Sequence, residues 1–214
     1  MKSFEVDVMG QGGAPGDLAV PDGATAVVLF AHGSGSGRHS PRNQAVAAAL
    51  NQHGLATMLT DLLTEPEEQA EAHTRHLRFD IDLLTERLQT ASAWLERDPS
   101  TSHLPLCYFG ASTGAAAALA AAATTPERVR AVVSRGGRPD LAHAALASVR
   151  APTLLIVGSL DTTVLALNRA ALDELQCERD MAVVEGATHL FEEPGALDEV
   201  ARLAGDWFER HVRT

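Results

Sequence analysis

The 214-residue sequence contains few cysteines and few basic residues, and it has no long apolar run. Cys107 and Cys177 are its only cysteines, too few for a disulfide framework, so we expect a reducing, cytoplasmic environment. The sequence has 17 Lys and Arg but 28 Asp and Glu, and this excess of negative charge disfavours nucleic acid or an anionic membrane as a partner. No segment approaches the length of a membrane span, and the N-terminus lacks the apolar stretch of a signal peptide, so we expect a soluble, unexported protein.

What the sequence does contain is an alternation of apolar strands and helical segments. Phe4, Val6 and Val8 alternate with polar residues, which predicts a half-buried antiparallel edge strand, and the Gly- and Pro-rich stretch 10–23 predicts turns. Apolar runs predict further strands, covered on both faces, over residues 27–31, 57–63, 106–109, 129–133, 153–157 and 181–184. Helical spacing predicts helices over residues 43–53, 79–95, 115–123, 164–175 and 196–212, and a solvated helix or loop from the acidic stretch 65–71. This order predicts an α/β fold with a mostly parallel, doubly wound sheet flanked by helices, in a single domain over residues 1–214.

A sharp turn from a strand into a helix is predicted at Gly110-Ala111-Ser112-Thr113-Gly114. The motif follows the apolar run 104–109 and precedes the helical segment 115–123, which is the setting of a G-x-S-x-G nucleophile elbow. The two glycines remove Cβ atoms that would clash where the helix passes close to the strand. Ser112 is therefore predicted to be a nucleophile, with an ordinary turn serine as the alternative.

A serine nucleophile needs a base, and the base needs an acid that fixes its tautomer. Asp161 and His189 each follow a predicted strand, and the carboxyl ends of parallel strands meet at one crevice. The chain order Ser112, Asp161, His189 is the order found in α/β-hydrolases, so we assign nucleophile, orienting acid and general base. A helix cap is the alternative role for Asp161, Asp140 is the reserve acid, and a structural role is the alternative for His189.

The oxyanion formed during acyl transfer needs two donors that already point at it. The backbone N–H of Thr113 is one candidate, and the N–H of Ser34, or alternatively of Gly35, is the other, because the glycine-rich loop 32–37 follows a predicted central strand. We expect His32 to support this loop by hydrogen bonding. A phosphate-binding loop is the competing interpretation, but the loop matches neither the P-loop nor the G-x-G-x-x-G pattern.

Two arginines follow predicted strands at the same edge of the sheet. Arg42 and Arg135 are candidates to bind a carboxylate or phosphate of the substrate, and pairing with surface carboxylates is the alternative. Cys107 is expected to be a core residue. His73 and His76 are three positions apart without an identifiable third ligand, so we expect no metal and no cofactor.

Together the motifs Phe30-Ala31-His32-Gly33-Ser34-Gly35, Gly110-Ala111-Ser112-Thr113-Gly114, Asp161 and Ala187-Thr188-His189-Leu190-Phe191 resemble those of the dienelactone hydrolase superfamily. The resemblance spans residues 27–212 and implies an α/β-hydrolase fold without a large cap domain. Dienelactone hydrolase itself carries a cysteine nucleophile, so Ser112 favours serine-esterase chemistry. Serine-type relatives also occur as modules fused to phosphoribosyltransferases, which implies a possible partner role.

The expected function is hydrolysis of small carboxylic esters or lactones through an acyl-enzyme. The segment between Arg135 and Pro152 is too short for a large lid, which favours small or flexible acyl groups over long lipid chains. A weakly active or non-catalytic partner module is the first alternative, and acyl transfer or perhydrolysis is the second. The partner we expect is a small-molecule substrate, and the sequence leaves the oligomeric state open.

Overall fold

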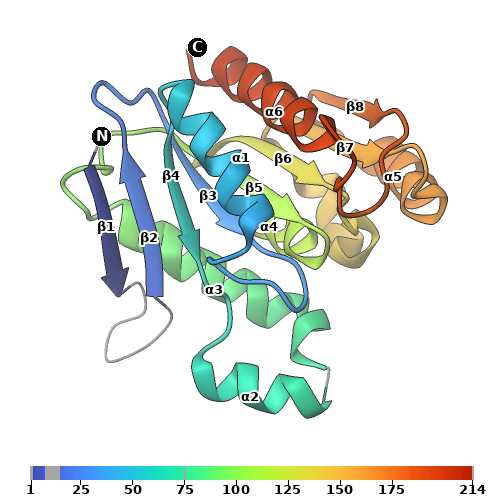
Figure 1. Cartoon of the computed structure of the whole chain (residues 1–214), viewed down its shortest axis with the longest axis horizontal. Helices are drawn as coiled ribbons and strands as arrows, with labels where there is room; N and C mark the ends of the chain where they lie inside the picture. The colour runs from blue at the N-terminus through green and yellow to red at the C-terminus, as the bar shows by residue number, and fades with distance from the viewer. Residues whose placement is uncertain (1, 8–14, 75, 214) are drawn as a thin grey trace.

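An eight-stranded sheet forms the centre of the protein (Figure 1), here a computed structural model that describes residues 2–7, 15–74 and 76–213. Its strand order is β1-β2-β4-β3-β5-β6-β7-β8. The strands are β1 (Lys2–Asp7), β2 (Pro15–Val20), β3 (Val27–Ala31), β4 (Ala56–Thr60), β5 (Leu106–Ala111), β6 (Val129–Arg135), β7 (Thr153–Gly158) and β8 (Arg179–Val184). Strands β1, β2 and β4 pair antiparallel, and every pair from β4 through β3 to β8 is parallel. The predicted mostly parallel sheet is confirmed.

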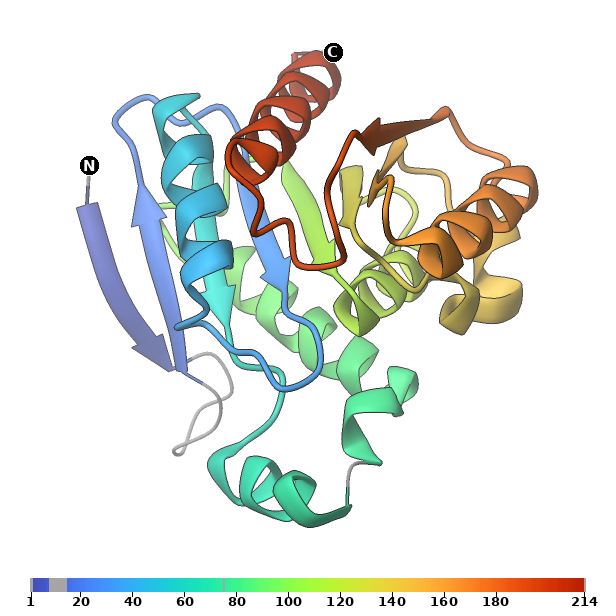
Figure 2. The ribbon, with the colours of Figure 1, turned by 45° about the vertical axis from the view of Figure 1, so that its right-hand side comes forward.

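Helices cover both faces of this sheet (Figures 1 and 2). On one face lie α1 (Pro41–Gln52) and α6 (Ala196–Val212), which bury Val46, Leu50 and Phe208 against the sheet. On the other face lie α3 (Ile81–Leu95), α4 (Thr113–Thr124) and α5 (Thr162–Glu174). The doubly wound architecture is therefore confirmed, and the predicted bounds of α6 match the observed ones.

The central strands are buried on both faces, whereas the edge strands are not. Every residue of β3, β4 and β5 is buried, because helices pack above and below them. The first strand is the predicted antiparallel edge, but the expectation of a half-buried strand is wrong: Phe4 is 43 % exposed and only Val6 is partly buried. The expectation that helices cover both faces of β8 is met only in part: Val184 is buried, Met181 and Ala182 are half-buried against opposite faces of the core, and Val183 is 42 % exposed. Each of these two strands has a neighbouring strand on one side only, so its apolar side chains remain partly accessible.

Two predicted boundaries differ from the structure near the N-terminal strands. Residues 15–20 form strand β2 instead of turns, because Leu18 inserts into the core while the backbone pairs with β1 and β4. Val8 and the predicted turn residues 10–14 lie outside the described residues. The predicted strand 57–63 ends at Thr60, although Leu62 and Leu63 remain buried after the chain has left the sheet. Burial without backbone pairing therefore explains the extra apolar residues.

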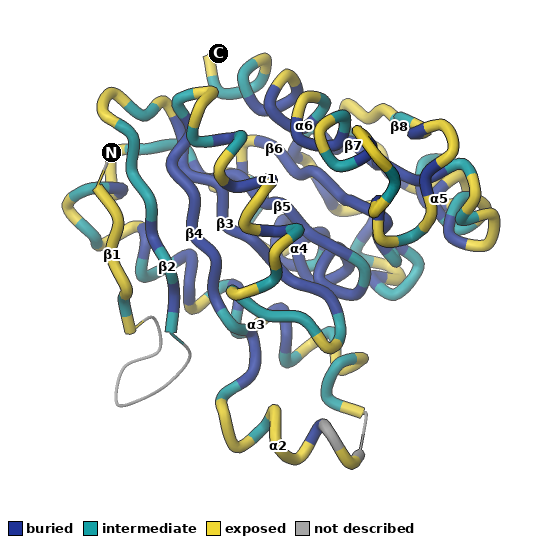
Figure 3. The backbone as a smooth tube through the Cα atoms, in the orientation of Figure 1, coloured by how far each residue is buried: buried dark blue, intermediate teal, exposed yellow. Residues whose placement is uncertain are grey.

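Short helical segments lie in the connection from β4 to β5, ahead of α3, and in the connection from β6 to β7. Helix α2 (Glu65–Thr74) and the 3₁₀ segment η1 (Leu77–Phe79) project from the sheet and are largely exposed (Figure 3), in agreement with the solvated segment predicted there. The 3₁₀ segment η2 (Pro139–Ser148) joins β6 to β7. No cap domain is formed by the described residues, and none of the helices they form is long and apolar enough to cross a membrane.

Candidate active site

Ser112 occupies a strained turn between β5 and α4. Its φ of 51° and ψ of −122° lie outside the regions that most residues adopt, and such strain is characteristic of functional sites. A Cβ at Gly110 would lie 2.4 Å from Ala115 Cα, and a Cβ at Gly114 would lie 2.2 Å from the Ala31 carbonyl oxygen. Both positions therefore require glycine, because α4 passes close to the neighbouring strands, as the motif predicts.

His189 is held by Asp161. Nδ1 of His189 donates a 2.6 Å hydrogen bond to Oδ2 of Asp161, which leaves Nε2 as the basic nitrogen. Asp161 occupies the N-cap position just before α5 but makes no side-chain capping bond, so a capping role does not account for it. The reserve acid Asp140 instead pairs with Arg138 at 2.7 Å.

Ser112 and His189 lie at the same edge of the sheet, next to the end of β6. The N–H of Ser112 donates to the carbonyl oxygen of Arg135 at 3.3 Å, and a Cβ at Gly136 would lie 3.5 Å from Nδ1 of His189. Among the described residues no hydrogen bond joins the Ser112 hydroxyl to the imidazole. Catalytic hydrogen bonds are often long in unliganded enzymes, so this geometry is compatible with a triad.

The two candidate oxyanion segments touch each other. Oγ of Ser34 and Oγ1 of Thr113 are 3.1 Å apart, which links the glycine-rich loop to the start of α4. A Cβ at Gly33 would lie 2.9 Å from Cβ of Ser112, so the loop passes directly beside the elbow. Within the described chain, neither the Ser34 N–H nor the Thr113 N–H donates to a backbone carbonyl of the fold. Neither N–H is therefore tied to a backbone acceptor of the described chain.

His32 supports the glycine-rich loop, as expected. Its Nε2 accepts a 2.9 Å hydrogen bond from the N–H of Leu62, so Nδ1 carries the proton and donates to the Gly33 carbonyl oxygen at 3.0 Å. The ring is buried and both nitrogens are used. His32 is thus a structural residue and not a second base.

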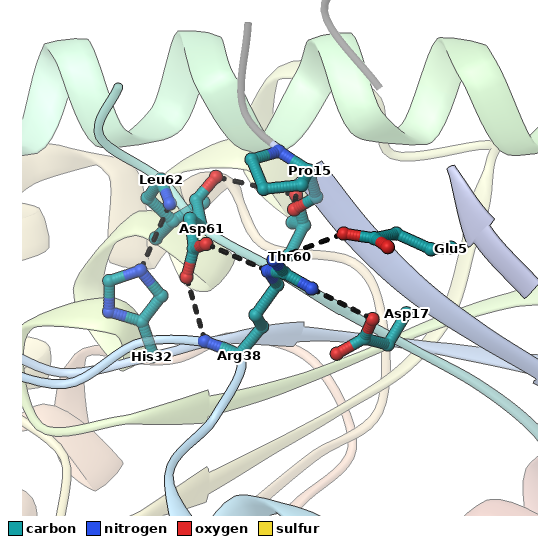
Figure 4. A network of polar contacts seen from close by, with 8 residues as sticks. All are labelled: Glu5, Pro15, Asp17, His32, Arg38, Thr60, Asp61 and Leu62. Carbon is teal, nitrogen blue, oxygen red and sulfur yellow. Dashed lines mark hydrogen bonds and ion pairs between the residues drawn. The ribbon is translucent and has the colours of Figure 1, made fainter. Parts of the chain in front are cut away.

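The other end of the same loop is held by Arg38, which the sequence analysis missed (Figure 4). The carboxylate of Asp61 accepts bonds from the Arg38 backbone N–H at 2.8 Å and from Nε at 3.1 Å. The guanidinium also pairs with Asp17 at 2.9 Å and Glu5 at 3.2 Å. Burial lowers the pKa of Arg38, but the charges of Asp17 and Asp61 outweigh burial and raise it above its ordinary value. The sequence could have revealed this pair, because Arg38 and Asp61 each follow the carboxyl end of one of two adjacent strands.

The two predicted substrate-binding arginines have different surroundings. Nη1 of Arg42 pairs with Glu192 at 3.0 Å, which was the alternative expectation for this residue. Arg135 is the last residue of β6 and is buried, and it has no carboxylate partner within the described residues. Burial, and secondly the charge of Arg42, lowers the pKa of Arg135 to about 10.

The remaining sequence candidates have structural or surface positions. Cys107 is fully buried in β5, and burial raises the pKa of its thiol to about 12, so a core role is confirmed. His73 and His76 are exposed, at the end of α2 and just before η1. No group of three His, Cys, Asp or Glu side chains in residues 2–7, 15–74 and 76–213 is arranged to hold a metal ion.

Two depressions flank the glycine-rich loop. A small pocket is lined by Ser34, Gly35, Thr113, Glu68, Glu71 and Arg78. An open cleft shares Gly35 and Glu68 with it and continues to Arg42. Glu71 is buried and bonds to Arg78 and to the N–H of Leu77, so α2 and η1 are joined where they line the small pocket.

Known proteins share this fold and, in part, this sequence. The family model of the alpha/beta hydrolase domain matches residues 24–202. A crystal structure of a dienelactone hydrolase from Anabaena variabilis is 57 % identical, covers 98 % of each chain and has a TM-score of 0.95. Est1E from Butyrivibrio proteoclasticus has a TM-score of 0.80 over 100 % of each chain but is only 14 % identical, so that similarity concerns the fold alone.

A longer relative occurs in Mycobacterium tuberculosis H37Rv. It is 56 % identical over 197 residues, which are 92 % of this chain, and its name assigns it provisionally to the phosphoribosyl transferases. The chain spans less than half of that relative, 44 % of its length. The family match nevertheless covers residues 24–202, and the 57 % identical dienelactone hydrolase covers 98 % of the chain, so both comparisons indicate the same fold. The protein therefore belongs to the α/β-hydrolase domain family and resembles dienelactone hydrolase, with a serine at the elbow.

Proposed function

We propose that the protein is a serine hydrolase that cleaves small carboxylic esters or lactones through an acyl-enzyme intermediate. The observation that carries this proposal is the 2.6 Å bond between His189 and Asp161 at the sheet edge where the strained Ser112 lies. An imidazole held in this tautomer presents a basic nitrogen, and a strained elbow presents a serine hydroxyl.

In the proposed reaction, Oγ of Ser112 attacks the acyl carbon while Nε2 of His189 accepts the hydroxyl proton. The oxyanion receives hydrogen bonds from the N–H groups of Thr113 and Ser34. The protonated imidazole then gives its proton to the leaving alkoxide, and the C–O bond breaks. A water molecule loses a proton to His189 and attacks the acyl-enzyme, which releases the acid and restores Ser112.

Small substrates suit the surroundings of the proposed nucleophile. The pocket beside Ser34 and Thr113, which Glu71 and Arg78 border, has a volume of about 10 Å³ and is too small for a long lipid chain. The connection from β6 to β7 is the short segment η2, so no large lid covers the site within the described chain. Acyl transfer or perhydrolysis would use the same acyl-enzyme with another acceptor in place of water.

The test is covalent labelling combined with turnover. We expect a fluorophosphonate to modify Ser112 stoichiometrically, and we expect Ser112→Ala to lose hydrolysis of p-nitrophenyl acetate by a factor of at least ~10³. Ser102→Ala is the matched control, because Ser102 is an exposed serine before the start of β5, whereas Ser112 follows the opposite end of that strand. Undiminished turnover in Ser112→Ala would contradict the assignment.

A second candidate is a partner module without turnover of its own. The longer Mycobacterium tuberculosis relative supports it, because a protein named for phosphoribosyl transfer contains a segment 56 % identical to this chain. In that case a folded, monodisperse sample would show no labelling of Ser112 and no hydrolysis of any ester. Stoichiometric labelling would favour the hydrolase.

A further inference from the structure

Asn168 is a fully buried amide in the middle of α5. Its Nδ2 donates to the Gly137 carbonyl oxygen at 2.9 Å and to the Val164 carbonyl oxygen at 2.8 Å. Because a carbonyl oxygen can only accept, these two bonds fix the orientation of the amide. Val164 belongs to the same helix, so the bond to Gly137 is the one that connects α5 to another segment.

An amide is a costly residue at this position of the helix. Among the described residues Oδ1 of Asn168 is buried without a hydrogen-bond partner, and burial of an unpaired polar group costs free energy. Asn is also a poorer residue than Leu for the interior of a helix. The other buried residues of α5 that face the core, Val164 and Ala171, are apolar. The bond to Gly137 is therefore what an amide provides here and an apolar side chain does not.

The segment that this amide holds is the turn 135–138, at the carboxyl end of β6, which binds the backbone of Ser112. The N–H of Ser112 donates to the Arg135 carbonyl oxygen at 3.3 Å, and the N–H of Arg138 donates to the Ser112 carbonyl oxygen at 3.0 Å. Two backbone bonds therefore connect the elbow to this turn. Gly137, whose carbonyl oxygen accepts from the amide, lies between the two residues that make them.

The same turn lies against His189. Gly136 has a φ of 51°, and a Cβ there would lie 3.2 Å from the carbonyl oxygen of His189 and 3.5 Å from its Nδ1. Gly137 approaches β6 even more closely, since a Cβ there would lie 2.0 Å from Oγ of Ser134. A displacement of the turn would therefore change the surroundings of both Ser112 and His189.

We propose that Asn168 is a positioning residue, which holds the turn 135–138 and thereby sets how Ser112 lies relative to His189. This proposal rests on the proposed hydrolase function. Helix α5 begins directly after Asp161, so the helix that carries Asn168 also carries the proposed orienting acid at its N-cap. The bond from the amide to the turn thus connects the segment behind the nucleophile to the helix that follows the acid.

Two variants test this role with p-nitrophenyl acetate. Asn168→Leu removes both bonds, whereas Asn168→Thr keeps a hydroxyl that can bond to the carbonyl oxygen of Val164 but is one bond too short to reach Gly137. We expect both variants to lower kcat about ten- to hundred-fold and to change KM by less than about two-fold, because a misplaced nucleophile slows the chemical step without loss of a substrate contact. The rate at which a fluorophosphonate modifies Ser112 should fall by a similar factor.

Asn51→Leu is the matched control. Nδ2 of Asn51 also donates two bonds, each of 2.9 Å, to the Leu55 carbonyl oxygen and to Oγ1 of Thr57. These residues lie around the amino end of β4, opposite to the sheet edge that carries the proposed site. Asn51→Leu should lower the Tm but leave kcat and the labelling rate unchanged. An equal fall of kcat in this control, or an unchanged kcat in a folded Asn168→Leu or Asn168→Thr, would overturn the proposal.

Proton NMR gives a readout that does not depend on turnover. The Nδ1 proton of His189, in a 2.6 Å bond to Asp161, should give a resonance far downfield of the other amide and ring protons. Asn168→Leu should shift or broaden this resonance, because Gly136 lies against the ring, and Asn51→Leu should leave it in place. A changed resonance without hydrolysis of any ester by the wild type would contradict the hydrolase and keep the effect of Asn168 on the turn. Hydrolysis by the wild type with an unchanged resonance and kcat in the Asn168 variants would do the reverse.

Discussion

Nδ1 of His189 lies 2.6 Å from Oδ2 of Asp161, although the two residues are 28 positions apart and follow different strands. Strands β7 and β8 are parallel neighbours, so their carboxyl ends place both residues at one edge of the sheet. The side chain of Asp161 is 14 % exposed and that of His189 is 39 % exposed, so the acid is shielded while the base stays accessible. This distribution suits the roles that we propose for them, orienting acid and general base.

Replacing Asp161 should reduce catalysis strongly and leave stability almost unchanged. Asp161→Asn should lower kcat by about 10³- to 10⁴-fold, because an amide no longer fixes the tautomer with a basic Nε2. The free energy of unfolding should change by less than about 1 kcal/mol, since Asp161 makes no capping bond to α5. Steady-state kinetics and urea unfolding measure the two effects. Asp140→Asn is the matched control, and a comparable loss of kcat in that variant would argue against the assignment of Asp161.

Loss of the bonds between Arg38 and Asp61 should lower kcat and leave KM nearly unchanged. The loop that carries the Ser34 N–H is held at one end by His32 and at the other by Arg38, both through residues 61–62. Arg38→Met should therefore lower kcat about ten-fold through misplacement of an oxyanion donor, with little change in KM. Kinetics with p-nitrophenyl acetate measure this split. A rise in KM at constant kcat would instead place Arg38 in substrate binding.

Gly114 should be intolerant of any side chain. A Cβ there would lie 2.2 Å from the Ala31 carbonyl oxygen and 2.4 Å from that of His32, and backbone atoms cannot move aside cheaply. Gly114→Ala should lower the free energy of unfolding by about 3 kcal/mol or more, or prevent folding. Ala120→Ser, on the partly exposed side of the same helix, should change it by less than about 1 kcal/mol. Equal stabilities of the two variants in chemical denaturation would contradict this close approach.

The sequence by itself determined the order of strands and helices and the elbow at Ser112. These features depend on short-range causes: apolar runs that need cover on both faces, the helical spacing of α6, and the glycines at 110 and 114. The proximity of Asp161 and His189 could be predicted for a related reason. The carboxyl ends of parallel strands converge whatever the details of packing, so their positions after β7 and β8 were sufficient.

Only the tertiary structure decided which of the described polar groups form ion pairs or hydrogen bonds and which do not. Arg42 and Arg135 look alike in the sequence, yet one pairs with Glu192 and the other is buried without a carboxylate partner among the described residues. The bonds of Arg38 to Asp61 and the pairing of β2 between β1 and β4 likewise join distant segments. Local periodicity carries no information about such contacts, because burial and pairing of a side chain depend on the elements that pack against it.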